Sequence, residues 1–185
     1  RLAHPYTDML ALSAMKLMVE NMLTVYEDGH NLNAREAMAL GSMQAGLSFS
    51  NASVALVHGM SRPIGALFHV PHGISNAMLL PAVLDYSKDA CIDRLADLGT
   101  FFNTEERHMT QEELANFAIE SIKELCKKMN IGNLKDWGIE ERVFYEAIPK
   151  MATDALASGS PGNNPKVPTH EELMELYKVA YHYKF

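Results

Sequence analysis

Cysteine, long apolar runs and positive charge are all scarce in this chain of 185 residues. The two cysteines, Cys91 and Cys126, lack metal-ligand spacing, so a reduced protein is the simple interpretation and one disulfide is the open alternative. The best apolar run, AMLLPAVL, is far shorter than the roughly 20 residues that a membrane-spanning helix needs. A net charge of −7 offers no basic field for phosphate backbones. These properties disfavour membrane proteins and nucleic-acid-binding proteins.

Strand patterns and phosphate-binding turns are missing as well. No short run alternates in polarity with β-branched residues, and no Gly-rich turn lies between a strand and a helix. No Gly-x-Ser-x-Gly pattern supports a serine nucleophile. The content of 48% apolar and 21% charged residues is that of an ordinary globular protein. We predict one all-α domain of about seven helices over residues 1–185, without repeats or interdomain linkers.

Capping patterns and apolar periodicity place these helices along the chain. Two Thr-x-x-Glu capping boxes, Thr110–Glu113 and Thr169–Glu172, mark helix starts. The turn-rich stretch SGSPGNNPKVP predicts an ordered loop or a surface far from any metal. The first two expected helices are 5–26 and one that opens with a box-like Asn33–Glu36 pair. A third follows His72 and is bent by Pro81, and a fourth runs from Lys88 to about Leu98 and ends at Gly99. The last three are 110–129, 140–156, which Pro149 disturbs, and 169–181.

The stretch from Gly46 to Tyr86 carries the residues of greatest chemical interest. His58 and His72 stand fourteen positions apart, and a glycine follows each. A long helix would not readily hold Pro63 and Pro71, because proline lacks an N–H and clashes with the preceding turn. The sequence therefore predicts that one helix ends near His58, that a loop follows, and that another helix begins near His72.

Two imidazoles at such a corner can share a divalent metal ion. The spacing alone is a weak signal, because a chain with eight histidines offers many such pairs. The alternative is a pair of hydrogen-bonded corner histidines. Catalytic metals also need about three or more protein ligands and an open position. Both interpretations stay open from the residues alone.

Two long segments resemble a known family. The run NAREAMALGSMQAGLSFSNASVALVHGMSRPIGALFHVPHGISNAMLLPAVLDYS is similar to the signature region of the iron-containing (metal-dependent, group III) alcohol dehydrogenases. The tail ALASGSPGNNPKVPTHEELMELYKVAY resembles the end of the same family's C-terminal helical domain. The resemblance implies a dehydroquinate synthase-like, all-α C-terminal domain, without the N-terminal α/β nucleotide-binding domain. Since the first helix follows Arg1 almost at once, we expect a domain cut from a larger protein.

The resemblance also implies a metal site. In that family, the histidines at the places of His58 and His72 are two of four ligands to a catalytic divalent metal. We therefore expect these two residues to bind metal, with Fe²⁺ as the first choice and Zn²⁺ as the alternative. The family's other ligands are an aspartate and, four residues later, a histidine. No Asp-x-x-x-His occurs in this chain, and the pair would lie before Arg1, so Asp8 and His4 are interpreted as a helix-start residue and a loop residue.

Arg62 and His69, between the two expected ligands, are candidate substrate-pocket residues. Many family members have a histidine at the place of Arg62, which is proposed to relay the substrate's proton. Arginine stays protonated and does not easily take that role. It would hold a carboxylate or phosphate of the substrate, or be structural. His69 would contact substrate or cap the loop. We predict no catalytic residue beyond the metal ligands and no cofactor-binding residue in the chain.

The implied activity is that of an oxidoreductase, an NAD(P)-dependent alcohol dehydrogenase that interconverts alcohols and aldehydes or ketones by metal-assisted hydride transfer. The expected partners are a small alcohol or aldehyde and the missing N-terminal domain, which would bind NAD or NADP. A cytoplasmic location is expected, with a homodimer as one assembly. The isolated chain is expected to bind metal poorly and to be inactive. The alternatives are a metal-dependent reductase of a carboxylated substrate, which Arg62 favours, and a non-enzymatic helical scaffold.

Overall fold

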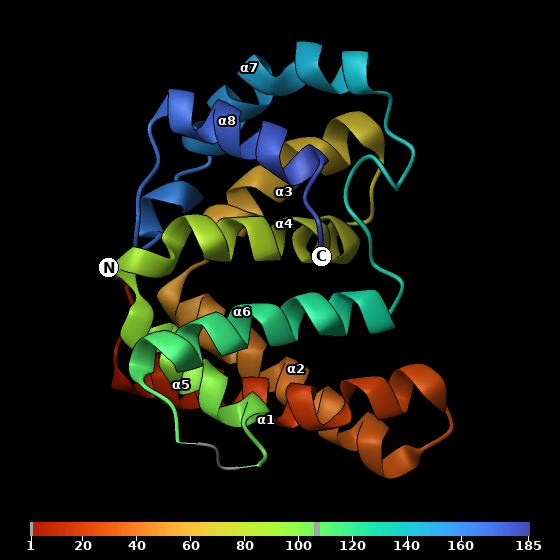
Figure 1. Cartoon of the computed structure of the whole chain (residues 1–185), viewed down its shortest axis with the longest axis vertical. Coiled ribbons are helices and arrows are strands. Elements are labelled where there is room, and N and C mark those ends of the chain that lie inside the picture. The colour runs from red at the N-terminus through yellow and green to blue at the C-terminus, as the bar shows by residue number, and fades with distance from the viewer. Residues whose placement is uncertain (1, 106–107) are drawn as a thin grey trace. The chain divides into compact units, whose positions relative to one another are not determined.

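The computed structural model describes residues 2–105 and 108–185 of the chain. These residues form eight α-helices and two short 3₁₀ helices, with no strand among them (Figure 1). This arrangement confirms the predicted all-α fold. No helix in the described part of the chain combines the length and the apolar character needed to cross a membrane. The elements are α1 (Pro5–Glu27), α2 (Leu32–Ala52), α3 (Leu56–Phe68), α4 (His72–Ser87), η1 (Lys88–Ala90), α5 (Ile92–Phe102), α6 (Gln111–Lys128), α7 (Glu141–Ala157), η2 (Ser160–Asn163) and α8 (His170–Tyr181).

The helices group into two compact units. The first contains residues up to 53 and residues 92–121, and the second contains residues 54–91 and 122–185. In the first unit, α1 and α2 form a hairpin in which the hydroxyl of Ser48 donates a 2.9 Å hydrogen bond to the carbonyl oxygen of Thr7. The cap of α2 is Asn31, whose side chain accepts the N–H of Ala34 at 3.1 Å. The expected start at Asn33 is therefore wrong, because an asparagine two residues earlier takes the capping role.

Gly99 lies inside α5 and does not end it, contrary to the expectation from the sequence. A Cβ atom at Gly99 would lie 2.2 Å from the carbonyl oxygen of Leu114 on α6. The glycine therefore serves the close approach of two helices within the first unit, which a sequence pattern does not distinguish from a helix end.

Both predicted Thr-x-x-Glu capping boxes are confirmed. At the start of α6, the N–H of Thr110 donates to the Glu113 carboxylate at 2.7 Å, and the N–H of Glu113 donates to Thr110 Oγ1 at 3.3 Å. At the start of α8, the N–H of Thr169 donates to Glu172 at 2.8 Å, and the N–H of Glu172 donates back at 3.1 Å. Each box satisfies two backbone donors that the first helical turn leaves unpaired.

Helices α3, α4, α7 and α8 of the second unit pack together (Figure 1). They supply most of the residues of one buried apolar cluster. Aromatic contacts link α7 to α8, since the rings of Phe144 and Tyr181 stack with centroids 4.8 Å apart. Because α3 and α4 both contribute residues to this cluster, their packing in it fixes the corner between them. Its largest fully buried side chains are Leu56, Met60, Ile64, Met78, Leu79, Leu134, Phe144, Ile148, Met151, Tyr177 and Tyr181.

The sequence patterns did not predict α3. The expectation that a helix ends near His58 is wrong, because α2 ends earlier, at a break where Ser53 has a φ of 64°. A new helix, Leu56–Phe68, then carries His58 in its first turn and has Pro63 buried in its interior. The proline costs one helical hydrogen bond, and the burial of the apolar face of α3 in the cluster offsets that loss. The other two helix-internal prolines also lie in unbroken helices, α4 and α7.

Replacing Gly99 with alanine is expected to lower the free energy of unfolding by about 1–3 kcal/mol, because the added methyl group must displace the backbone at Leu114. Gly46→Ala is the matched control. Gly46 lies within α2 with no atom within 4 Å of the new Cβ, so alanine there should stabilise the helix by up to about 1 kcal/mol. Urea unfolding of both variants measures the difference. Equal changes in the free energy of unfolding in the two variants would contradict the view that Gly99 is needed for the close approach of α5 and α6.

Candidate metal centre

The structure brings His58 and His72 together. His58 lies in the first turn of α3, and His72 is the first residue of α4. Their ring centroids are 5.3 Å apart and the ring planes are inclined by 57°. His58 is half-buried and His72 is exposed. The two imidazoles predicted from the sequence therefore form a pair at the corner between two helices.

The residue after His58 allows a close contact that holds α3 in place. A Cβ atom at Gly59 would lie 2.9 Å from the ring of Pro161 in η2. The side chain of Asn163 donates a 3.1 Å hydrogen bond to the carbonyl oxygen of Val54, just before α3. The turn-rich stretch around η2 is thus an ordered loop, as predicted. Pro161 of this stretch packs on Gly59, the neighbour of His58.

A buried tyrosine also holds α3. The hydroxyl of Tyr177 on α8 donates a 2.9 Å hydrogen bond to the carbonyl oxygen of Met60, and both residues are fully buried. Burial raises the pKa of Tyr177 well above its ordinary value. The hydroxyl therefore stays protonated across the neutral pH range, and α3 keeps this anchor two residues after His58.

The electrostatic environment keeps the imidazole of His58 neutral. Burial lowers the pKa of His58 below its ordinary value, and the charges of His72 and Arg62 lower it further. Arg62 lies one helical turn after His58, so both side chains belong to the same side of α3. A neutral imidazole has a free lone pair, which is the form that binds a metal.

Two polar residues surround the ring of His72. Ser61 Oγ, from the interior of α3, lies 3.2 Å from His72 Nδ1. The side-chain nitrogen of Asn76 lies 3.1 Å from His72 Nε2 and donates to the His72 carbonyl oxygen at 2.8 Å. Sequence reasoning missed both residues. Helical spacing from His72 would have found Asn76, whereas Ser61 required knowledge of α3.

The two candidate substrate-pocket residues differ in their surroundings. His69 is the cap of α3, with a φ of 54° and its backbone N–H donating to the carbonyl oxygen of Gly65 at 3.1 Å. Its backbone thus takes the capping role that was one of the two expectations for this residue. Its side chain is exposed, as is that of Arg62. Contact of either side chain with a substrate stays a prediction.

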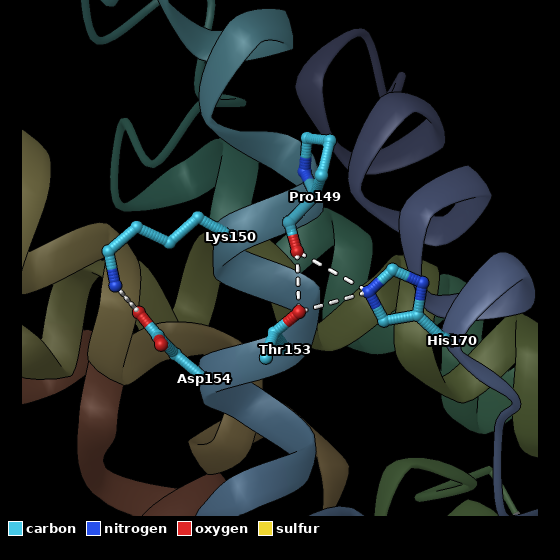
Figure 2. A network of polar contacts seen from close by, with 5 residues as sticks. All are labelled: Pro149, Lys150, Thr153, Asp154 and His170. Atoms are coloured by element: carbon cyan, nitrogen blue, oxygen red, sulfur yellow. Dashed lines mark hydrogen bonds and ion pairs between the residues drawn. The ribbon is translucent and has the colours of Figure 1, made fainter.

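His170 shows a structural use of histidine in the same unit. Its Nε2 atom lies 3.2 Å from Thr153 Oγ1 and 3.4 Å from the carbonyl oxygen of Pro149 (Figure 2). An ion pair between Lys150 and Asp154, with 2.6 Å between nitrogen and oxygen, lies on the same helix (Figure 2). His170 thus ties the start of α8 to α7, and it offers a comparison for substitutions of His58 and His72.

The donor set fits part of a metal site. Two adjacent imidazoles suit a borderline divalent ion, and the buried Oδ1 atom of Asn76 beside them has no hydrogen-bond partner in the described part of the chain. Within residues 2–105 and 108–185, no three His, Cys, Asp or Glu side chains gather closely enough to hold a metal. Since a catalytic ion needs about three or more protein ligands, His58 and His72 fit as members of a larger ligand set.

The sequence and the fold of this chain are similar to those of known proteins. Residues 1–181 match the Fe-containing alcohol dehydrogenase family, C-terminal. The chain is 35% identical over 180 residues to 1,3-propanediol dehydrogenase of Citrobacter freundii, covering 97% of this chain and 46% of that protein. It is 38% identical over 150 residues to lactaldehyde reductase of Escherichia coli strain K12, covering 80% and 38%. A crystal structure of 1,3-propanediol oxidoreductase matches with a TM-score of 0.91 and 32% identity, covering 98% and 47%. The chain thus spans less than half the length of these relatives.

Replacing Tyr177 with phenylalanine should remove the anchor on Met60 and lower the free energy of unfolding by about 1 kcal/mol. The folded state holds the Tyr177 proton more tightly than the unfolded state, so this contribution is complete below about pH 10 and declines above it. Between about pH 9 and about pH 11, the original protein should therefore lose more stability than the variant. Denaturant unfolding at several pH values measures both effects. The exposed Tyr6→Phe is the control, and a Tyr177→Phe profile that parallels it would contradict the prediction.

Proposed function

The chain belongs to the Fe-containing alcohol dehydrogenase family, and from that premise we propose that it is the C-terminal metal-binding domain of an NAD(P)-dependent enzyme that interconverts alcohols and aldehydes or ketones. The observation that carries the proposal is the His58–His72 pair, with ring centroids 5.3 Å apart. The names of the two enzymes reported above specify a diol and a hydroxyaldehyde as substrates. They support a small alcohol or aldehyde as the substrate class.

His58 and His72 would hold a divalent ion, with Fe²⁺ preferred and Zn²⁺ as the alternative. Such an ion supplies Lewis-acid chemistry at a substrate oxygen when it is bound. The half-buried position of His58 lowers its pKa and keeps a nitrogen lone pair ready at neutral pH. The same burial limits the access of water to one side of the pair.

We propose that sequence preceding Arg1 supplies the rest of the enzyme. An aspartate and a histidine spaced as Asp-x-x-x-His would complete the ligand set, and an α/β domain would bind NAD or NADP. The coverage of less than half of the relatives' length supports this division. Cys91 and Cys126 are buried and form no disulfide within the described residues. A cytoplasmic location stays a prediction. A homodimer stays a prediction.

In the full-length protein, His58→Ala and His72→Ala should each weaken metal binding by more than the ~10–100-fold that loss of an outer-shell partner costs. Each substitution removes one imidazole from the pair. Elemental analysis and competition with a chelator measure the bound metal, and NAD(P)H oxidation with an aldehyde measures turnover. His170→Ala is the control, because His170 contacts only α7 residues among the contacts described above.

Full metal content in both the His58 and the His72 variant would overturn the proposed site. The isolated 185-residue chain provides a further comparison. It contains only part of the ligand set within its described residues, so it should bind metal weakly and should not oxidise NAD(P)H. Turnover by the isolated chain would show that the preceding domain is not required. A full-length protein that binds no metal in cells would favour the non-enzymatic scaffold.

The exposed guanidinium of Arg62, one turn from His58, favours a second candidate function. A reductase of a carboxylated substrate would use Arg62 to bind the carboxylate through charge-assisted hydrogen bonds. The main proposal and this alternative predict opposite substrate preferences, which a panel of uncharged aldehydes and 2-oxo acids resolves.

If the carboxylate is bound by Arg62, Arg62→Gln should raise KM for 2-oxo acids by about 10–100-fold, the effect of losing a hydrogen bond to a charged group. KM for uncharged aldehydes should change little, because Arg62 would have no partner on them. Steady-state kinetics of the full-length enzyme provides the measurement, and Arg142→Gln, at an exposed ion pair on α7, is the matched control. An enzyme that reduces only uncharged aldehydes would exclude this alternative.

A further inference from the structure

Two buried hydroxyl groups lie beside His72. Ser61 on α3 and Ser75 on α4 are both fully buried, and their oxygen atoms are 2.5 Å apart. Ser61 Oγ is 3.2 Å from His72 Nδ1, and Ser75 Oγ donates to the carbonyl oxygen of His72 at 3.1 Å. The two serines thus link the imidazole of His72 to its own backbone. Buried hydroxyl groups carry a cost unless their hydrogen bonds are made.

The number of protons available to these contacts determines which atom donates in each hydrogen bond. Three contacts connect His72 Nδ1, Ser61 Oγ, Ser75 Oγ and the His72 carbonyl oxygen. The two hydroxyl groups supply two protons, and the carbonyl oxygen can only accept. Ser75 gives its proton to the carbonyl oxygen, and Ser61 gives its proton to Ser75. The proton between the ring and Ser61 must then come from Nδ1 of the imidazole.

The side chain of Asn76 lies beside both the imidazole of His72 and the hydroxyl group of Ser61. Its side-chain nitrogen lies 2.8 Å from the His72 carbonyl oxygen, which requires a donor and thereby fixes the orientation of the amide. That nitrogen is 3.1 Å from His72 Nε2 and 3.4 Å from Nδ1. The second proton of the amide group reaches Ser61 Oγ at 3.2 Å, which leaves the Nε2 lone pair open to a metal ion.

We propose that Ser61, supported by Ser75, is a positioning residue that holds His72 as the Nδ1–H tautomer and so presents the Nε2 lone pair for metal binding. The proposal rests on the metal-binding function proposed above. A hydrogen bond from the second ring nitrogen of a metal-binding histidine fixes the orientation of the ring and raises its basicity. The neutral imidazole of free histidine favours the Nε2–H tautomer in water. The effect of Ser61 on the tautomer of His72 can therefore be measured.

Ser61→Ala tests the proposal in the full-length protein. In the metal-free protein, the nitrogen chemical shifts of ¹⁵N-labelled histidine should show Nδ1–H at His72, and the variant should move toward Nε2–H. Its metal affinity, measured with Fe²⁺ or Zn²⁺ and a competing chelator, should fall by about 10–100-fold. Ser75→Ala should give a smaller change in the same direction, because Ser61 then loses the acceptor of its proton.

Ser87→Ala is the matched control for the loss of a buried hydroxyl group. Ser87 is buried on α4 and accepts a 2.8 Å hydrogen bond from the side chain of Asn164, away from both imidazoles. The Ser87→Ala variant should be less stable than the original protein, as the Ser61→Ala variant should be. Its His72 tautomer and its metal affinity should stay unchanged. An unchanged tautomer in Ser61→Ala, or an equal fall in metal affinity in Ser87→Ala, would overturn the proposal.

The same measurements separate this proposal from the proposed function. If His72→Ala releases the metal but Ser61→Ala changes neither tautomer nor affinity, the metal site stands and the role of Ser61 is refuted. If Ser61→Ala shifts the tautomer while His58→Ala and His72→Ala both leave metal binding intact, the hydrogen-bond chain stands and the metal site is refuted.

Discussion

The second unit depends on how closely α3 can approach the segments that follow it in the sequence. Because Gly59 has no side chain, the ring of Pro161 can lie only 2.9 Å from where a Cβ atom of residue 59 would be. The carbonyl oxygen of Met60 accepts a 2.9 Å hydrogen bond from the hydroxyl of Tyr177. Both residues come directly after His58. The contacts that stabilise the core therefore also set the position of the imidazole, so a packing defect here is at once a defect of the site.

The two histidines of the corner lie in different environments. His58 is half-buried, and the low polarity around it, together with nearby positive charge, keeps its ring neutral. His72 is exposed. In the tautomer proposed above, the Nδ1–H group of its ring donates to the hydroxyl group of the buried Ser61. A corner between two helices can provide both environments because one helix faces the core and the other begins at the surface.

Local signals were predictable from the sequence, and close packing was not. The capping boxes at Thr110 and Thr169 involve residues three apart, so their pattern is complete in the sequence. Gly99 and Pro63 have strong local tendencies that distant contacts override, which is why a helix end was expected at the first and no helix around the second. The histidine pair was identified through family resemblance. The role of Ser61 depends on distances that appear only in the folded chain.

The anchor of α3 comes from far along the chain, because 117 residues separate Tyr177 from Met60. Contacts of such sequence separation form late in folding, since a long loop must close before they can contribute. During synthesis, the residues around His58 leave the ribosome long before α8 does. The geometry of the corner is thus completed only after α8 has been synthesised. The order of synthesis would then govern when His58 and His72 reach their final positions.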